Sequence, residues 1–399
     1  MACIFGGHCL RCDFRMNAEA AQSACPLCDG GIEFLLKFSD QDADRDRLSA
    51  IPDFNMGRYE ALLPLPGLAA VANGIGGTPL LEAKNLGKTL GLEQLKLKDD
   101  TRNPSASLKD RATLAVLMAA KERGHKIVAT ASTGNAAASL AALSVRIGIE
   151  AIVFAPKDAP PAKLNQVLAH GARLYRVDGD YDYAYDLCQA AVRKFGWYSR
   201  STGNNPYCAE GKKTVAFEIA EQLEWKAPDF VFVPTGDGSI LGSTHKGFRE
   251  LFELGWIDKM PRLVAVQAEG SCSVVDAWEM GRNIQAVLSK TLADSIAVDY
   301  PRDGERALRA LKESEGFGLR VSDEEILDAL GMLARSEGIF AEPAAAAAIA
   351  GLKRAVDDKL LPREATIVAL ITGHGLKDSG ALAPKFDPSQ LVSKLGDLA

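Results

Sequence analysis

The sequence lacks several features that would place it in other classes of protein. Its formal net charge is −6 at pH 7, so it has no excess of Lys and Arg to neutralise nucleic-acid phosphates. No apolar run reaches the roughly 20 residues of a membrane-spanning helix. The N-terminus has neither the basic flank nor the apolar core of a signal peptide. We therefore expect a cytoplasmic protein that binds neither nucleic acid nor membranes.

Cysteine is scarce beyond residue 28, and five of the eight cysteines lie within residues 1–28. Two Cys-x-x-Cys pairs stand out in this first segment. Each pair can supply two thiolate ligands from one turn to a shared metal ion. We predict a structural zinc ion held by four of these thiolates, although unpaired cysteines in a tail are the alternative. The predicted ligands are Cys9, Cys12, Cys25 and Cys28.

The order of motifs divides the chain into a small module and two larger units. Residues 1–35 form the predicted zinc ribbon and residues 36–75 a connector. After the connector, strand and helix patterns alternate, which is typical of an α/β fold with parallel strands. Strands are predicted at 95–98, 126–130, 151–154, 173–177, 230–233, 263–268 and 367–371. We predict two open-sheet domains: a large one over 76–111 and 207–399, and a small one over 112–206.

One lysine occupies an unusual position for a cation. The segment Asn103-Pro-Ser-Ala-Ser-Leu-Lys109 follows a predicted strand and opens a helix. A helix dipole disfavours a cation in the first turn. A desolvated lysine has a lowered pKa and becomes a nucleophile towards carbonyl groups. An exposed, solvated lysine is the ordinary alternative for such a residue.

Three further motifs lie at junctions where predicted strands end. Ala131-Ser-Thr-Gly-Asn135 offers amides and hydroxyls to an anion. Pro234-Thr-Gly-Asp-Gly-Ser-Ile-Leu-Gly242 lets backbone amides approach a phosphate, and it also fits a loose dinucleotide-binding pattern. Thr372 follows the last strand, where α/β proteins place ligands. The glycine motif keeps a nicotinamide-dependent oxidoreductase open as an alternative.

Taken together, these motifs resemble threonine synthase and its relatives among the fold type II pyridoxal-phosphate (PLP) enzymes. The resemblance runs from about Gly76 to Asp378 and includes Gly-Gly-Thr-Pro-Leu at 76–80, Asn205-Pro-Tyr, Glu210-Gly-Lys-Lys-Thr and Glu342-Pro-Ala. It implies the tryptophan synthase beta-like fold, a PLP-dependent carbon–oxygen lyase and a homodimer. The implied reaction converts O-phosphohomoserine and water to threonine and phosphate.

The resemblance also implies a role for each motif. Lys109 would hold the cofactor as a Schiff base, and Asn135 would contact the ring oxygen. Thr372 would meet the pyridine nitrogen, while Ser132 and Thr133 would bind the substrate carboxylate. The cofactor phosphate would lie in the loop formed by Gly236, Asp237, Gly238, Ser239 and Ile240.

Two positions depart from the family pattern. Asp237 stands in the phosphate loop, so its side chain must point away from the phosphate or be protonated. Cys208 stands where many threonine synthases carry an arginine for the substrate phosphate. Other cations that could replace that arginine are Arg102, Lys157 and Arg200. The cysteine leaves open a β-replacement or β-elimination on a serine-type substrate, as in a cysteate synthase-like enzyme or an ammonia lyase.

Overall fold

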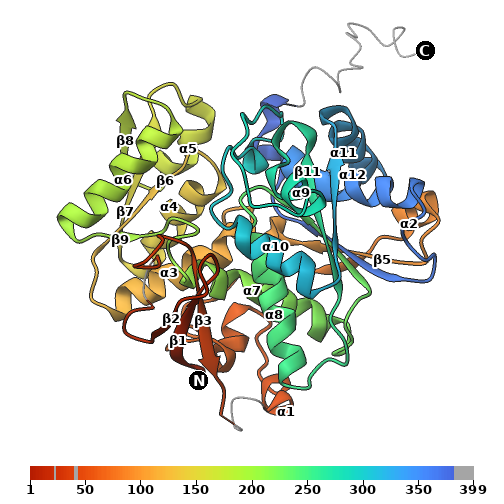
Figure 1. Cartoon of the computed structure of the whole chain (residues 1–399), viewed down its shortest axis with the longest axis horizontal. Helices are drawn as coiled ribbons and strands as arrows, with labels where there is room; N and C mark the ends of the chain where they lie inside the picture. The colour runs from red at the N-terminus through yellow and green to blue at the C-terminus, as the bar shows by residue number, and fades with distance from the viewer. Residues whose placement is uncertain (22–23, 40–43, 382–399) are drawn as a thin grey trace, which may run out of the picture.

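The structure is a computed structural model that describes residues 1–21, 24–39 and 44–381. It contains three sheets (Figure 1). The smallest comprises β1 (Cys3–Cys9), β2 (Arg15–Asn17) and β3 (Ile32–Lys37), paired antiparallel in the order β2-β1-β3. The two larger sheets lie side by side in Figure 1, the four-stranded one on the left and the six-stranded one on the right. Among the described residues, no helix is both long and apolar enough to cross a membrane.

The six-stranded sheet has the order β12-β11-β10-β13-β5-β4. Its central strands are buried apolar runs, as expected for parallel strands covered by helices on both faces. All neighbouring pairs are parallel except β4 with β5. The strands are β4 (Leu80–Glu82), β5 (Gln94–Asp99), β10 (Phe230–Pro234), β11 (Arg262–Ala268), β12 (Phe317–Val321) and β13 (Thr366–Ile371).

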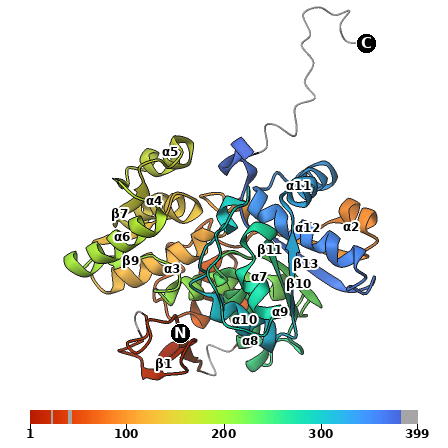
Figure 2. The same cartoon turned by 45° about the horizontal axis from the view of Figure 1, so that its top comes forward.

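The four-stranded sheet has the order β8-β7-β6-β9, and all its pairs are parallel. Its strands are β6 (Ile127–Ala131), β7 (Glu150–Pro156), β8 (Arg173–Val177) and β9 (Tyr198–Ser199). Helices α4 (Asn135–Ile147) and α5 (Pro161–Ala169) connect neighbouring strands as crossover units, and α6 (Tyr181–Phe195) connects β8 to β9 at the opposite edge. Figure 2 shows α4, α5 and α6 grouped around this sheet, apart from α11 and α12.

Helices α3 (Lys109–Glu122), α7 (Tyr207–Gln222) and α8 (Ser239–Glu253) pack against one another in the middle of the molecule. On the far side of the large sheet, α11 (Asp323–Glu337) packs against α12 (Pro343–Asp357). α11 begins with a capping box: Glu325 N donates to Ser322 Oγ and Ser322 N donates to the Glu325 carboxylate. This reciprocal pair satisfies two amides that the helix start leaves open. The remaining helices are α1 (Arg45–Ser49), α2 (Lys84–Leu90), α9 (Ser273–Glu279) and α10 (Gly304–Glu313).

A network of buried charges ties the large sheet to α3 and α7. Lys98 on β5 donates to Glu218 Oε2 on α7 at 2.6 Å. Arg111 on α3 donates to the same carboxylate and to Asp100 Oδ2 at 2.7 Å. All these side chains are at most 1% exposed. Buried charges are tolerated when they are paired in this way, and removal of one partner leaves the other uncompensated.

Candidate active site

One cavity brings together the ends of several strands and the start of α3. It is lined by Lys109, by residues 234–240 after β10, by Thr372 after β13, and by Thr202, Lys212, Ser295, Ile296, Glu342 and Ala344. The carboxyl ends of the parallel strands β10 and β13 therefore supply the two predicted motifs at one sheet edge. Lys109, Gly236, Asp237, Gly238, Ser239, Ile240 and Thr372 meet here, as the motif order predicts.

Lys109 is the first residue of α3, and the backbone around it is fixed. Leu108 N donates to Thr372 O at 2.9 Å, which ties the helix start to the end of β13. The preceding turn is held by the Ser105 amide, which donates to Asp110 Oδ2 at 2.7 Å. Burial and the neighbouring Lys212 lower the pKa of Lys109 to about 8, against the opposing effect of Glu342. An amine with this pKa is partly neutral near pH 7, so it can attack a carbonyl group and exchange protons.

The loop after β10 is shaped for close approach of a ligand to the backbone. Gly238 has φ +86°, a conformation that strains residues with a side chain, and a Cβ there would lie 2.6 Å from Asp303 O. A Cβ on Gly236 would lie 2.7 Å from Ile296 Cα. Ser239 begins α8, so open amides and the positive helix end face this loop. The arrangement suits a phosphate group.

Asp237 points its carboxylate towards the segment before α10. Its Oδ1 accepts a hydrogen bond from Arg302 N at 2.6 Å, and Asp303 N donates to Asp237 O at 3.1 Å. Burial and the neighbouring Asp303 carboxylate raise the pKa of Asp237 to about 7. The Asp237 carboxylate is therefore bound by the backbone of the segment before α10. This explains how an acidic residue fits in an anion-binding loop.

Asn135 has a carboxylate partner that the sequence motif did not reveal. At the start of α4, Asn135 Nδ2 donates to both Glu342 oxygens at 2.9 Å and lies 3.3 Å from Ser295 Oγ. Glu342 is 2% exposed, and burial raises its pKa against the effect of Asn135 and Lys109. The one sequence feature that marks Glu342 is its position directly before Pro343, which begins α12. Glu342 thus joins the small sheet's helix α4 to the cavity.

The predicted carboxylate-binding residues Ser132 and Thr133 lie between β6 and α4. Ser132 Oγ accepts from Gly134 N at 3.2 Å, and Ser132 N donates to Phe154 O at 3.1 Å. Among the residues described, the cavity lining includes neither of them. They stand two and three residues before Asn135, and their role at a substrate carboxylate stays a prediction.

The cavity has the groups that a carbonyl-bearing, phosphorylated, nitrogen-containing cofactor requires. Lys109 supplies an amine, the glycine loop supplies amides, and the Thr372 hydroxyl lies at the end of β13 with 5% exposure. Residues 71–373 match the family model described as pyridoxal-phosphate dependent enzyme. The chain belongs to this family. The family assignment leaves no basis for a nicotinamide-dependent oxidoreductase.

Within the family, the chain is similar to threonine synthases. It is 36% identical over 379 residues to threonine synthase of Methanocaldococcus jannaschii, covering 94% of this chain and 93% of that protein. It is 38% identical over 330 residues to threonine synthase of Mycobacterium bovis, covering 80% and 89%. The chain therefore belongs to the threonine synthase family.

Solved structures extend the likeness in fold to more distant PLP enzymes. Threonine deaminase isoform 2 of Solanum lycopersicum superposes with a TM-score of 0.67 at 23% identity, covering 83% of this chain and 85% of that one. An L-serine ammonia-lyase of Rhizomucor miehei superposes with a TM-score of 0.68 at 24% identity, covering 77% and 96%. At this identity the likeness supports the fold, and the predicted fold type II architecture is confirmed.

The four predicted zinc ligands come together beside β1. Cys9, Cys12, Cys25 and Cys28 present sulfur atoms that all lie within 4.8 Å of one another. Although burial raises the pKa of Cys25, the amides of Leu27 and Cys28 lower it to about 7. Four convergent thiols at this spacing fit a tetrahedral metal ion.

The cysteine module, residues 1–35, is joined to α10 by ion pairs and a hydrogen bond. Arg11 Nε donates to Glu305 Oε1 at 2.8 Å, and Arg306 Nη2 donates to Ile32 O at 2.9 Å. Glu33, 3% exposed, lies between Arg249 and Arg306, at 2.6 and 3.2 Å. Because Asp303, just before α10, contacts the phosphate loop, the module braces a segment that shapes the cavity.

Proposed function

We propose that this chain is a threonine synthase, which converts O-phosphohomoserine and water to threonine and phosphate. The observation that carries the proposal is the position of Lys109 in a cavity between Thr372 and the glycine loop. Identities of 36–38% to threonine synthases over most of the chain support the choice of reaction. The predicted division into a large domain (76–111 and 207–399) and a small one (112–206) would put this cavity between the two.

The residues around the cavity suit the proposed chemistry. PLP, when bound, supplies an electron sink that stabilises negative charge on the substrate's carbon atoms. Lys109 would hold the cofactor and then, as a free amine, move protons at successive substrate carbons. Its pKa of about 8 allows both the accepting and the donating form near neutral pH. The neutral Thr372 would leave the ring nitrogen mostly unprotonated, so more of the proton transfer depends on Lys109.

Other residues would bind and orient. The amides of Gly236–Ile240 would hold the cofactor phosphate, and Asn135 would donate to the ring oxygen. Ser132 and Thr133 would hold the substrate carboxylate. Glu342, whose pKa is raised by burial, would keep Asn135 in place by accepting hydrogen bonds from its Nδ2.

A second candidate is β-replacement or β-elimination on a serine-type substrate. Cys208 favours it, because a buried cysteine offers no charge to a phosphate leaving group. The holoenzyme, offered O-phosphohomoserine, phosphoserine and serine separately, distinguishes the two. We expect threonine and phosphate in equal amounts from O-phosphohomoserine. Conversion of phosphoserine or serine, with no threonine formed from O-phosphohomoserine, would support the second candidate instead.

We also propose that Cys9, Cys12, Cys25 and Cys28 bind one structural zinc ion. Their sulfur atoms converge within 4.8 Å, and the segment braces α10 beside the phosphate loop. Elemental analysis should find about one zinc per chain, and the double variant Cys9→Ser/Cys12→Ser should lose it. Cys3→Ser, an exposed cysteine outside the cluster, is the matched control. Metal-free wild-type protein with four titratable thiols would contradict the assignment.

A further inference from the structure

Nearly all fully buried cations in the described part of the chain are paired with carboxylates. Lys98 and Arg111 pair with Glu218, and Lys213 and Lys246 both pair with Glu210. Such pairing offsets the cost of removing a charge from water. Two buried cations differ: Arg200 and Lys212, each 1% exposed, have no carboxylate of any described residue within ion-pairing distance. Both lie next to the cavity.

Arg200 follows β9 and has an unused donor. Its Nε donates to Thr113 Oγ1 and its Nη1 to Thr202 Oγ1, both at 3.3 Å, whereas its buried Nη2 has no hydrogen-bond partner. Thr202 lines the cavity, so the guanidinium contacts a residue of the cavity wall. Buried polar groups are rarely left unsatisfied, and one that is unsatisfied requires an explanation.

Lys212 lies on α7, one helical turn after Cys208, and lines the cavity. Its Nζ donates to Ser239 Oγ at 2.6 Å, the one neutral group that it contacts among the described residues. Burial lowers the pKa of Lys212 and Arg200 acts in the same direction, while Cys208, Asp303 and Asp237 oppose the shift. Arg200 and Lys212 therefore repel each other, and a bound anion would offset this cost.

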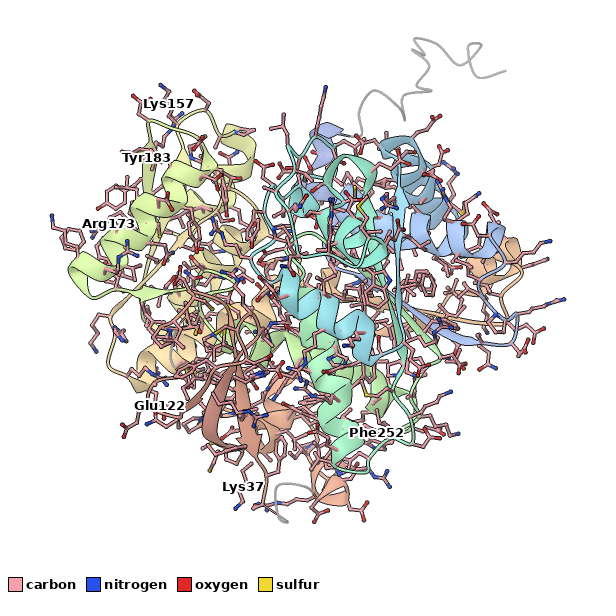
Figure 3. The ribbon with its side chains drawn as sticks, in the orientation of Figure 1. Lys37, Glu122, Lys157, Arg173, Tyr183 and Phe252 are labelled. Atoms are coloured by element: carbon pink, nitrogen blue, oxygen red, sulfur yellow. The ribbon has the colours of Figure 1, made fainter. Side chains whose placement is uncertain are left out.

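Cys208 lies close in the structure to both Arg200 and Lys212. Its Sγ donates to Arg200 O at 3.6 Å, and it precedes Lys212 on the same face of α7. The position where many threonine synthases have an arginine therefore contacts the backbone of Arg200 and lies one helical turn before Lys212. The other candidate cations are excluded by geometry. Arg102 is mostly exposed and pairs with Asp99, and Lys157 lies on the outer surface of the small sheet and pairs with Asp178 (Figure 3).

We propose that Arg200 and Lys212 form the subsite for the substrate's phosphate group, in place of an arginine at position 208. The proposal rests on the proposed function, since it takes a phosphate monoester of an amino acid as the substrate. The amides of the glycine loop and the positive end of α8 would hold the cofactor phosphate. Arg200 and Lys212 are therefore free to bind a second dianion, the phosphate group that leaves the substrate.

Binding of inorganic phosphate to the holoenzyme tests the subsite without relying on turnover. Calorimetric titration should show that Arg200→Gln and Lys212→Gln each weaken phosphate binding roughly 10- to 150-fold, the loss expected for one charge-assisted contact. Lys157→Gln, which removes a surface cation, should bind phosphate as the wild type does. Wild-type affinity retained in both cavity variants, or no binding by the wild type itself, would overturn the proposal.

Two further readouts separate the subsite from other roles of these residues. With O-phosphohomoserine, the variants should raise KM by a similar factor with a smaller change in kcat. Their melting temperature without phosphate should not fall, because an unpaired buried cation has been replaced by a neutral group. Reduced cofactor affinity with unchanged phosphate affinity would assign the cations to the cofactor phosphate and overturn the proposal.

Threonine formation and phosphate binding can succeed or fail independently, so the failure of the proposed function and the failure of the proposed subsite are distinguishable. If the wild type forms no threonine while Arg200→Gln still weakens phosphate binding, the threonine synthase assignment fails and the anion subsite stands. If the wild type forms threonine with an unchanged KM in both variants, the reaction stands and the subsite is overturned.

Discussion

Lys109→Ala should abolish the visible absorbance of lysine-bound cofactor and nearly all activity. The residue is the one amine at the start of α3 that lines the cavity beside the glycine loop and Thr372. Loss of its acid–base function alone would lower kcat roughly 10²- to 10⁴-fold, and loss of the covalent link adds to this. Absorbance spectra and threonine formation, measured on the same preparation, check the two effects together.

Lys121→Ala is the matched control, since Lys121 is an exposed lysine in the last turn of the same helix. It should retain both the spectrum and the activity. Borohydride reduction of Lys109→Ala followed by peptide mapping gives a second readout. A cofactor adduct recovered at another lysine would show that Lys109 is not the attachment point.

Glu218→Gln should destabilise the fold by about 3–5 kcal/mol, because it leaves two buried cations without their shared counter-ion. Lys98 and Arg111 both donate to this carboxylate, and all three side chains are fully buried. Denaturant unfolding measures the change. Glu224→Gln, at an exposed acid just beyond α7, should be within about 0.5 kcal/mol of the wild type. A similar small effect for Glu218→Gln would show that the network contributes little.

The same carboxylate predicts how stability depends on pH. Although burial raises the pKa of Glu218, Arg111 and Lys98 lower it to about 2 from an ordinary value of 4.5. The folded state therefore binds this proton less readily than the unfolded state. The stabilisation is complete above about pH 4.5 and is lost as the pH falls towards 2. Glu218→Gln should show a shallower loss of stability over that interval.

The part of the site that lies at strand ends could be predicted from the sequence. Lys109, the glycine loop and Thr372 each follow a strand or open a helix, and parallel strands bring their carboxyl ends to one edge. Glu342, Thr202 and Lys212 could not be identified this way. Glu342 and Lys212 are buried at the cavity because of how α7 and α12 pack, and Thr202 lines the same cavity, so none of the three follows from local pattern.

In the two larger sheets, the strands that were not predicted from the sequence are β4, β9 and β12. β4 and β9 have three and two residues, too few for a pattern to emerge. β12 lies at the edge of its sheet and is only half-buried along most of its length, so it lacks the apolar run of β10. The structure also distinguishes among the three proposed replacement cations, because only Arg200 is buried.

Turnover of O-phosphohomoserine in ¹⁸O-labelled water tests the central claim most directly. In the proposed reaction the carbon–oxygen bond to phosphate breaks and water adds to a substrate carbon. We therefore expect the label in the hydroxyl group of threonine, and unlabelled phosphate released in equal amount. Label in the phosphate, with homoserine as the product, would show simple ester hydrolysis and contradict a PLP-dependent threonine synthase.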